Sequence, residues 1–258
     1  MEAGLNLYSI RGSIKTEPDF LETAKKVKEM GYSYLQYSGG PFDPEMIRRV
    51  SEETGLPVCL THVPADRILN DTEQLMADHA VFGCKNIGLG AMPTDVIADE
   101  TRCKEMIEKL DAVGEKMLKN GFKFFYHHHH YEFFKHNGET VFDYILNNTS
   151  NINFIIDTYW LQFAGVSVLD YIKKVSGRME CIHLKDYTIA HKILEDNKHK
   201  YEPVFCPVGD GTIDFKAVVK AAKESGAKYF LVEQDNATTH ADPFGQVERS
   251  INYIRSEL

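Results

Sequence analysis

"FKAVVKAAKESGAKYFLVEQD", residues 215–235, contains one complete helix-to-strand unit in a single stretch. Its first part places apolar residues at helical spacing, and Gly226 follows as a residue typical of a helix end. The next apolar run, residues 229–232, has the length of a buried strand and leads directly into Glu233. The stretch therefore predicts a helix, a strand and an acidic side chain at the carboxyl end of that strand.

The same alternation of helix and strand runs through the whole chain. Helices are expected at residues 19–31 and 43–55, where Asp43 is placed to cap the second helix and Pro44 lies in its first turn. Strands are expected at eight apolar runs, which are residues 5–10, 34–38, 57–63, 86–91, 123–129, 153–157, 180–185 and 229–234. Eight strands alternating with helices favour an α/β fold, a closed (β/α)8 TIM barrel, over an open doubly wound sheet. No linker divides the chain, so residues 1–258 are expected to form one domain.

The composition is that of an ordinary globular protein, with 43% hydrophobic and 26% charged residues. A formal net charge of −9 argues against a nucleic-acid partner, which would require clustered Lys and Arg. No run of 18 apolar residues and no signal-peptide pattern is found, so we expect a cytoplasmic protein with no membrane partner. The five cysteines are scattered without a CxxC pair, which argues against a disulfide framework or a thiolate zinc site. A small-molecule substrate is the favoured partner, and a homo-oligomer stays open.

Polar side chains end three consecutive predicted strands. Asp157 ends the sixth strand, His183 and Lys185 lie two residues apart on the seventh, and Glu233 lies at the matching depth on the eighth. The active sites of such barrels form at the carboxyl ends of the strands, so these side chains are expected to converge. Carboxylates with an imidazole suit a divalent cation such as Mn²⁺, Mg²⁺, Co²⁺ or Zn²⁺.

The fifth predicted strand contains four consecutive histidines, in the segment YHHHHYEF at residues 126–133. Side chains alternate along a strand, so His127 and His129 are expected to point into the barrel mouth and the other two toward the helix layer or a loop. Glu132 follows as the only carboxylate of the segment. This segment is expected to complete the ligand set.

Each of these residues also has a structural interpretation. Asp157 precedes a turn and is suited to cap a helix, and His183 fits a hydrogen-bonded core histidine. Lys185 with Asp186 fits a surface ion pair. Four polar residues at corresponding strand ends nevertheless favour a shared site, because independent caps would not be expected to align.

The segment YHHHHYEF resembles the Y-H-N-H-x-x-E-F signature of the xylose-isomerase-like barrel superfamily, the group of sugar phosphate isomerases, epimerases and related enzymes. His128 departs from this signature, which has Asn at that position. Further segments agree in order along the chain: DTYWLQFAG (157–165), HLKD (183–186), PVGDGTIDF (207–215) and VEQD (232–235). The resemblance implies a (β/α)8 barrel with one divalent metal held by Glu, Asp, His and Glu.

Carried over to this chain, the resemblance implies Asp157, His183 and Glu233 as metal ligands. The strand-five ligand is open between two residues, because a Glu of some relatives aligns with His127, and here either Glu132 reaches back to the metal or His127 replaces the carboxylate. Glu132 is the preferred ligand, and Mn²⁺ is the preferred ion over Mg²⁺, Co²⁺ and Zn²⁺.

The resemblance also implies catalytic roles. Glu233 with Glu132 or His129 is expected to form the acid/base pair, and Lys185 to stabilise the developing oxyanion. The candidate substrate-binding residues are His62, His127 and Trp160. His62 precedes Pro64 and fits a hydrogen-bonded turn histidine equally well, and a single Trp is as often part of a core.

The leading hypothesis for function is a divalent-metal-dependent isomerase or epimerase of a sugar or polyol. It would remove a proton next to a carbonyl and pass through a metal-stabilised enediolate. The alternative is a metal-dependent lyase or dehydratase acting on a keto-sugar, a 3-keto-glycoside or an inosose. A DNA-repair enzyme is disfavoured by the acidic charge, and a sugar sensor without catalysis by retention of the ligand set.

A long connection, residues 186–214, follows the seventh predicted strand. It is expected to be an irregular lid or binding loop, with a solvated insertion as the alternative. Within it, the VGDGT segment at residues 208–212 suits a turn that anchors the loop. A phosphate site there is disfavoured because Asp210 would repel an anion.

Overall fold

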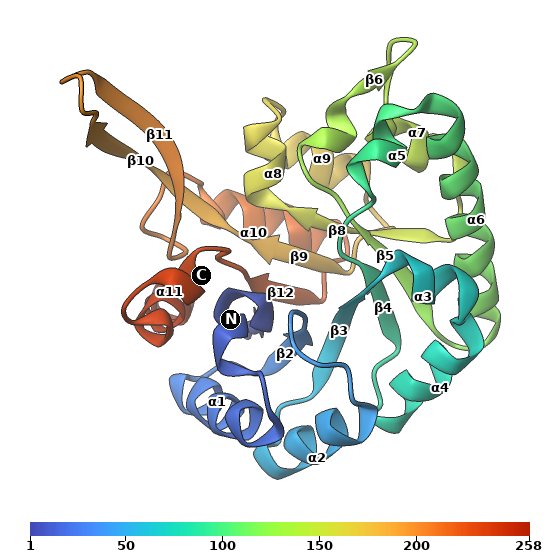
Figure 1. The fold of residues 1–258 in the computed structure, drawn as a ribbon, viewed down its shortest axis with the longest axis horizontal. Coiled ribbons are helices and arrows are strands. Elements are labelled where there is room, and N and C mark those ends of the chain that lie inside the picture. Colours follow the sequence, from blue (N-terminus) through green and yellow to red (C-terminus); the bar gives the residue numbers. More distant parts are fainter.

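The computed structural model describes residues 1–258 and forms a closed barrel of eight parallel strands (Figure 1). Their order around the barrel is β1-β12-β9-β8-β5-β4-β3-β2, so the first and last strands of the chain pair and close it. The prediction of a (β/α)8 barrel is confirmed. The barrel strands are β1 (Gly4–Asn6), β2 (Tyr34–Tyr37), β3 (Val58–Val63), β4 (Asn86–Leu89), β5 (Lys123–His127), β8 (Ile152–Asp157), β9 (Cys181–Leu184) and β12 (Tyr229–Val232).

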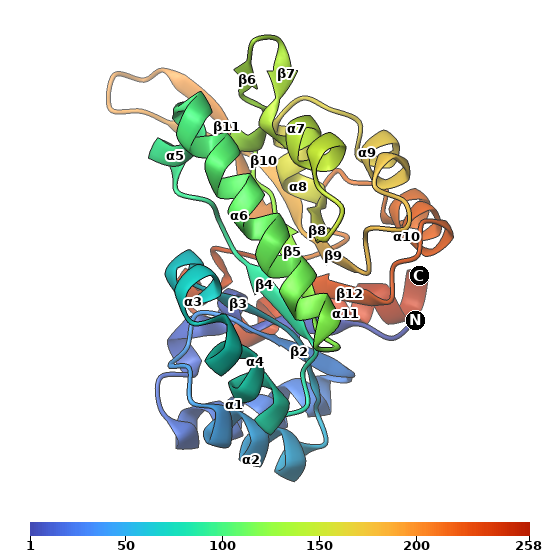
Figure 2. The same ribbon diagram turned by 90° about the vertical axis from the view of Figure 1, so that its right-hand side faces the viewer.

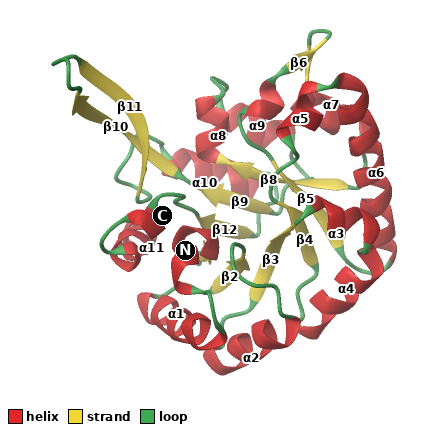
Figure 3. Ribbon diagram, viewed as in Figure 1, coloured by secondary structure: helices red, strands yellow, loops and turns green.

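Helices surround the barrel on its outer side (Figures 2 and 3). Capping residues in the sequence mark where the helices begin. Thr16 and Asp19 form a capping box at the start of α1, and Asp43 accepts a hydrogen bond from the Met46 backbone N–H at the start of α2. The α-helices are α1 (Glu17–Met30), α2 (Pro44–Thr54), α3 (Ala65–Asn70), α4 (Thr72–Val81), α5 (Thr94–Ala98), α6 (Glu100–Lys119), α7 (Val141–Asn148), α8 (Thr158–Phe163), α9 (Val168–Lys174), α10 (Phe215–Glu224) and α11 (Pro243–Glu257). Short 3-10 helices occur at η1 (Leu7–Ser13), η2 (Tyr131–Phe133) and η3 (Ala237–Thr239).

The inward side chains of the strands form two successive layers. The first, which we call the apolar layer, is a separate buried cluster that includes Tyr34, Leu60, Phe125, Ile155, Cys181 and Leu231. Because side chains alternate along a strand, the residue two positions further on points inward at the next level. These residues, which we call the polar layer, are Gln36, His62, His127, Asp157, His183 and Glu233. One step of two residues on six strands thus replaces hydrocarbon with titratable and amide groups.

The connection after β9 is a regular β-hairpin rather than the irregular loop expected from the sequence. Its strands β10 (Asp186–Ile193) and β11 (His199–Cys206) pair antiparallel along their whole length and project beyond the barrel (Figure 1). The physical reason is alternation, since Tyr187 and Ile189 on one strand share a face with Tyr201 on the other. A second, small hairpin of β6 (Lys135–His136) and β7 (Glu139–Thr140) lies between η2 and α7.

Asp186 ties the base of the long hairpin together. Its buried carboxylate accepts backbone N–H groups of Gly209 and Gly211, at 3.0 Å each, and of Ile213 at 3.4 Å. A Cβ at Gly211 would lie 2.2 Å from Asp186 Oδ1, so the turn requires glycine there. The backbone amides of the VGDGT segment therefore hold the chain's own carboxylate, in agreement with a turn that anchors the loop.

All five cysteines are free thiols in buried positions. The helices include none that combines the length and apolar character needed to span a bilayer.

Candidate active site

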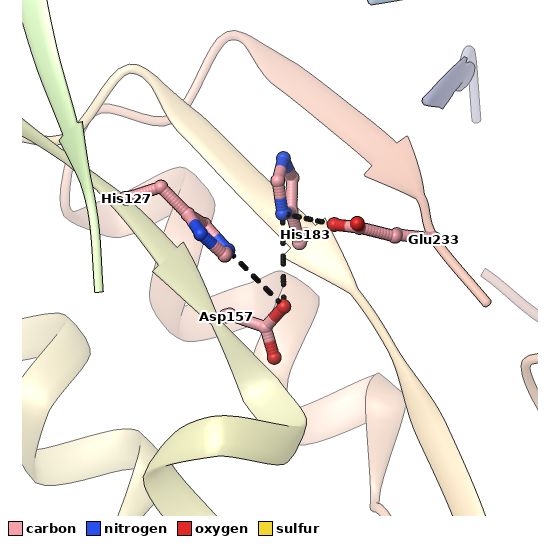
Figure 4. A group of neighbouring side chains, drawn as sticks. All are labelled: His127, Asp157, His183 and Glu233. Carbon is pink, nitrogen blue, oxygen red and sulfur yellow. Dashed lines mark hydrogen bonds and ion pairs between the residues drawn. The ribbon is translucent and has the colours of Figure 1, made fainter. Parts of the chain in front are cut away.

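Four polar-layer residues lie together at the carboxyl ends of their strands (Figure 4). His127, Asp157, His183 and Glu233 are all buried and each offers one ligand atom within 4.8 Å of the others. Ligands at about 2.0–2.2 Å from one ion lie within about 4.4 Å of each other, so a small contraction would bring all four into one coordination shell. The three positions Asp157, His183 and Glu233 are thus gathered as the sequence led us to expect, with His127 as their fourth member.

The surroundings of His127 leave its Nε2 free to bind an ion. Its Nδ1 lies 2.9 Å from the Gly90 carbonyl oxygen, which only accepts hydrogen bonds, so Nδ1 carries the proton. Nε2 then presents its lone pair toward Asp157 Oδ2, which lies 3.4 Å away. A backbone carbonyl that orients an imidazole in this way is the usual partner of a metal-bound histidine.

His183 is oriented by an amide in the same manner. Its Nε2 lies 2.8 Å from Gln36 Oε1, which leaves Nδ1 facing the two carboxylates. Nδ1 approaches Glu233 Oε2 to 2.5 Å and Asp157 Oδ2 to 3.6 Å. Neither His183 Nδ1 nor Glu233 Oε2 has a partner in hydrogen-bond geometry, although both are buried. Two such atoms pointing at one spot are the arrangement expected of ligands to a shared cation.

The electrostatics of this spot favour a positive charge. Burial opposes protonation of His183, but Glu233 and Asp157 outweigh burial and raise its pKa to about 9. A divalent cation would take the place of that proton. Two imidazole nitrogens and two carboxylate oxygens suit Mn²⁺, Co²⁺ or Zn²⁺ by donor type, and thus fit a metal of the expected class.

Asp157 serves two purposes at once. Its Oδ1 accepts the Trp160 backbone N–H at 3.0 Å and caps α8, while Oδ2 faces His127 and His183. Burial disfavours its charge, but Lys185 and the two histidines hold the pKa of Asp157 well below its ordinary value. The helix-cap interpretation and the ligand interpretation therefore both describe this residue.

Lys185 lies buried beside the four-residue group rather than on the surface. Its Nζ lies 3.2 Å from Asp157 Oδ2, 3.7 Å from Glu233 Oε1 and 3.0 Å from Asp235 Oδ1. Burial opposes its charge, yet these carboxylates raise the pKa of Lys185, so it is an ammonium. The alternative of a surface ion pair with Asp186 is excluded, because Asp186 binds backbone amides of the hairpin base. Three carboxylates around one ammonium leave negative charge for a divalent ion to neutralise.

A cavity of about 410 Å³ opens above the group, a volume typical of small-molecule sites. Its polar lining includes His62, His127, His129, Lys185, Glu233 and Asp235. The two lining histidines outside the four-residue group are half-buried, and their partial removal from water lowers their pKa values, that of His129 to about 2 and that of His62 well below its usual range. The cavity therefore offers neutral imidazoles, one ammonium and carboxylates to a substrate.

Glu132 lies outside both the four-residue group and the cavity lining. It is fully buried in η2, where Oε1 accepts the Tyr126 hydroxyl and Oε2 accepts the His129 backbone N–H, each at 2.7 Å. Both oxygens are thus used to hold the chain after β5. The arrangement favours His127 over Glu132 as the strand-five ligand, and it does not support the expected role of Glu132 as a catalytic acid or base.

Trp160 and His128 lie outside the cavity lining. Trp160 does not line the cavity but packs against His129, with ring centroids 5.2 Å apart, and Lys185 Nζ lies 5.2 Å from its ring. His128 points outward, where its Nε2 accepts the Asp157 backbone N–H at 3.1 Å. It therefore positions a strand end instead of contacting substrate.

Two residues of the site were not predicted from the sequence. Gln36 bonds to His183, and Asp235 pairs with Lys185 and lines the cavity. A glutamine within a strand carries no signal of its own. Asp235 follows Glu233 by two residues on the same inward face, and this spacing was the available signal.

Comparison with known proteins agrees with this architecture. Residues 24–257 match the model of the xylose isomerase-like TIM barrel family. The chain belongs to this family. Its membership places the chain among enzymes that include sugar isomerases, epimerases and some dehydratases.

The curated relatives found for this family member are inosose dehydratases. One from Clostridium perfringens is 24% identical over 268 residues, a match covering 90% of this chain and 85% of that protein. Another, from Geobacillus thermodenitrificans, is 33% identical over 111 residues, which cover 40% of this chain and 37% of that protein.

Solved structures of the family share the fold at low sequence identity. A sugar phosphate isomerase/epimerase from Parabacteroides distasonis has a TM-score of 0.81 at 19% identity, with 99% of this chain and 94% of that chain covered. A probable 3-DHS dehydratase from Bacillus anthracis has a TM-score of 0.72 at 12% identity, covering all of both chains. A barrel protein from Mycobacterium smegmatis, solved in complex with magnesium, has a TM-score of 0.70 at 15% identity, covering 98% and 94%.

Proposed function

We propose that this protein is a divalent-metal-dependent dehydratase of a keto-polyol, which removes a proton next to the carbonyl and then expels a hydroxyl group. The observation that carries the proposal is the convergence of unpaired ligand atoms from His183 and Glu233 with His127 and Asp157 at the floor of the cavity. A bound divalent ion would polarise the carbonyl and the adjacent hydroxyl of the substrate. We expect Mn²⁺ as the preferred ion.

Glu233 is the proposed base. It is the one carboxylate of the four-residue group that lines the cavity, and Lys185 and His183 overcome the effect of burial to hold its pKa well below the ordinary value. An ionised carboxylate is ready to accept a carbon-bound proton at neutral pH. Lys185, whose Nζ lies 3.7 Å from Glu233 Oε1, can stabilise the negative charge that develops on the substrate oxygen.

His129 is the proposed proton donor to the departing hydroxyl. It lines the cavity, and its Nδ1 lies 2.9 Å from the Tyr131 hydroxyl. Burial raises the pKa of Tyr131, so it stays a phenol whose hydroxyl can donate a hydrogen bond to Nδ1, which leaves the proton of the neutral imidazole on Nε2. A departing oxygen needs such a donor, since hydroxide is a poor leaving group.

Elimination is favoured over epimerisation by the position of Glu132. Epimerisation by two carboxylates would require Glu132 beside the substrate, and this carboxylate is held outside the cavity by Tyr126 and His129. The curated relatives, which are inosose dehydratases, support the same choice.

Epimerisation of a ketose is the second candidate. It is favoured by one observation: His129 and Glu233 line the same cavity, so a second acid/base group is available to return a proton. Both candidates share proton abstraction next to a carbonyl and differ in the step that follows.

One experiment tests both candidates. Protein loaded with Mn²⁺ is incubated in deuterated water with an inosose, a 3-keto-glucoside and a set of ketoses, and products are followed by mass spectrometry and by absorbance of an unsaturated ketone. Loss of water, or of the aglycone from the 3-keto-glucoside, with a new absorbance supports elimination, whereas a deuterated epimer without loss of either group supports the second candidate. Neither change with any substrate, while the Glu233→Gln control behaves identically, would contradict the proposed chemistry.

A further inference from the structure

We propose that Gln36 is a positioning residue that fixes the protons of two histidines at once, keeping His183 Nδ1 bare for the metal and making His62 a hydrogen-bond donor to the substrate. This inference rests on the proposed function, because it assigns a task to a metal ligand. It goes beyond that function by naming how metal binding and substrate recognition are connected.

Gln36 occupies the polar layer on β2 and is fully buried between the two imidazoles. Its Oε1 lies 2.8 Å from His183 Nε2, and its Nε2 lies 3.0 Å from His62 Nε2. The same amide nitrogen donates to Ser38 Oγ at 3.3 Å. Every polar atom of the amide therefore has a partner within the site.

The orientation of the amide follows from the chemistry of His183. If the amide were turned over, its NH₂ group would face His183 Nε2, which would then have to accept a hydrogen bond. An imidazole that accepts at Nε2 carries its proton on Nδ1, the atom directed at Glu233 and Asp157. Metal binding at Nδ1 is compatible only with the orientation in which Gln36 Oε1 accepts from Nε2–H.

That orientation determines the state of His62. The amide NH₂ of Gln36 donates to His62 Nε2, so the single proton of the neutral ring is on Nδ1. His62 Nδ1 has no partner within the protein, and His62 lines the cavity. It therefore presents an N–H to an oxygen of the bound substrate, in keeping with a keto-polyol, which offers carbonyl and hydroxyl acceptors.

The two histidines are thus linked through one amide. Binding of an ion to His183 holds Gln36 in place, and Gln36 in turn holds the donor direction of His62. We expect the bound ion, which fixes the proton of His183 on Nε2, to maintain the donor direction of His62.

The first test measures metal affinity by calorimetric titration of Mn²⁺ into the full chain, with no substrate. Gln36→Leu removes the hydrogen bonds to both histidines at nearly constant volume, and we expect its Mn²⁺ affinity to fall by about 10–100-fold. The matched control is Asn86→Leu, which removes a buried amide that bonds to the Cys59 carbonyl at the opposite end of the barrel. This control should bind Mn²⁺ like the unchanged protein.

The second test reads the proton positions directly. Gln36→Glu still accepts from His183 Nε2–H, but a carboxylate cannot donate to His62, whose proton should then move to Nε2. Histidine ¹⁵N NMR of the chains loaded with diamagnetic Zn²⁺ distinguishes the two tautomers, with His62→Asn used to assign the signals. We expect an Nδ1–H tautomer of His62 in the unchanged protein and an Nε2–H tautomer in Gln36→Glu.

The outcomes separate this inference from the proposed function. If the unchanged protein binds no Mn²⁺, the proposed function fails and this inference fails with it. If it binds Mn²⁺ but Gln36→Leu binds within about threefold of it, or if the His62 tautomer is the same in both NMR samples, the inference alone is overturned. Circular dichroism of each variant establishes that it is folded, and the NMR arm decides the matter if Gln36→Leu is not.

Discussion

The apolar layer and the polar layer of the barrel interior differ in what holds them together. In the apolar layer, Leu231 and Ile155 pack against hydrocarbon and contribute through burial alone. In the polar layer, Glu233 and Asp157 are buried just as deeply, and each depends on a charge or a hydrogen bond from another strand. The lower layer stabilises the barrel, and the upper layer uses that rigidity to hold groups that would otherwise repel one another.

The comparison shows how little of the chain a site of this kind requires. Glu233 lies two residues beyond Leu231 of β12, and His183 lies two residues beyond Cys181 on β9. In each case an apolar inward side chain is followed by a polar one. Substitutions in the two layers should therefore separate stability from chemistry.

The largest effect is expected from Glu233→Gln, which removes the proposed base while keeping the shape of the side chain. We expect kcat on the active substrate to fall by about 10²–10⁴-fold. Steady-state kinetics with a matched thermal melt measures both properties. Activity retained within tenfold would mean that the polar layer does not supply the base.

Leu231→Ala, on the same strand but in the apolar layer, should lower stability and leave catalysis unchanged. We expect the free energy of unfolding to fall by about 2–5 kcal/mol, because a buried side chain is replaced by a cavity. Chemical denaturation measures this loss. At a temperature where the variant is folded, its kcat should stay near that of the unchanged protein, and a large drop in kcat would break the separation of the two layers.

A divalent ion should stabilise the fold through the polar layer. At a Mn²⁺ concentration about 100 times the dissociation constant, we expect a gain of about 2.7 kcal/mol, measured as a rise in the melting temperature that a chelator reverses. Asp157→Asn removes one ligand oxygen and should abolish most of this rise. An equal rise in both proteins would place the ion somewhere else.

The smallest effect concerns Glu132, which lies behind the polar layer. Burial, partly opposed by Tyr126 and the His129 backbone N–H, raises its pKa to about 7. The folded state therefore binds the proton more tightly than the unfolded chain, so this contribution is present below about pH 4.5 and is lost as the pH rises toward 7. Between these pH values, the free energy of unfolding should fall in the unchanged protein by about 1–3 kcal/mol more than it falls in Glu132→Gln. Denaturation curves at pH 5 and pH 7 measure the difference, and parallel losses would contradict it.

The barrel was predictable because its signals are local. Apolar runs of strand length alternate with amphipathic helices, and caps such as Asp43 mark where the helices begin. The convergence of Asp157, His183 and Glu233 followed from the same topology, since strand ends meet at one face of a barrel. The alternation of Tyr187, Ile189 and their partners also indicates the hairpin of β10 and β11. Polar residues at its tip obscured that pattern.

The identity of the strand-five member could not be read from the sequence for a geometric reason. Glu132 lies five residues beyond His127, and the turn at η2 decides whether its carboxylate returns to the barrel. That turn directs it to Tyr126 instead. Gln36 and Asp235 were missed because their roles depend on partners on other strands, at distances that no spacing within the chain encodes.

The hydrogen bonds of Asp186 form a clamp at the base of the β10–β11 hairpin, which is the projecting arm. This clamp separates movements of the arm from the residues of the candidate active site. Lys185 immediately precedes the first residue of β10, yet the Asp186 carboxylate fastens both ends of the arm to one turn before the arm leaves the body. Swinging of the tip should therefore be absorbed above the clamp. The turn at residues 194–198 is a suitable place to attach a fluorophore or a surface tether without displacing the Lys185 ammonium.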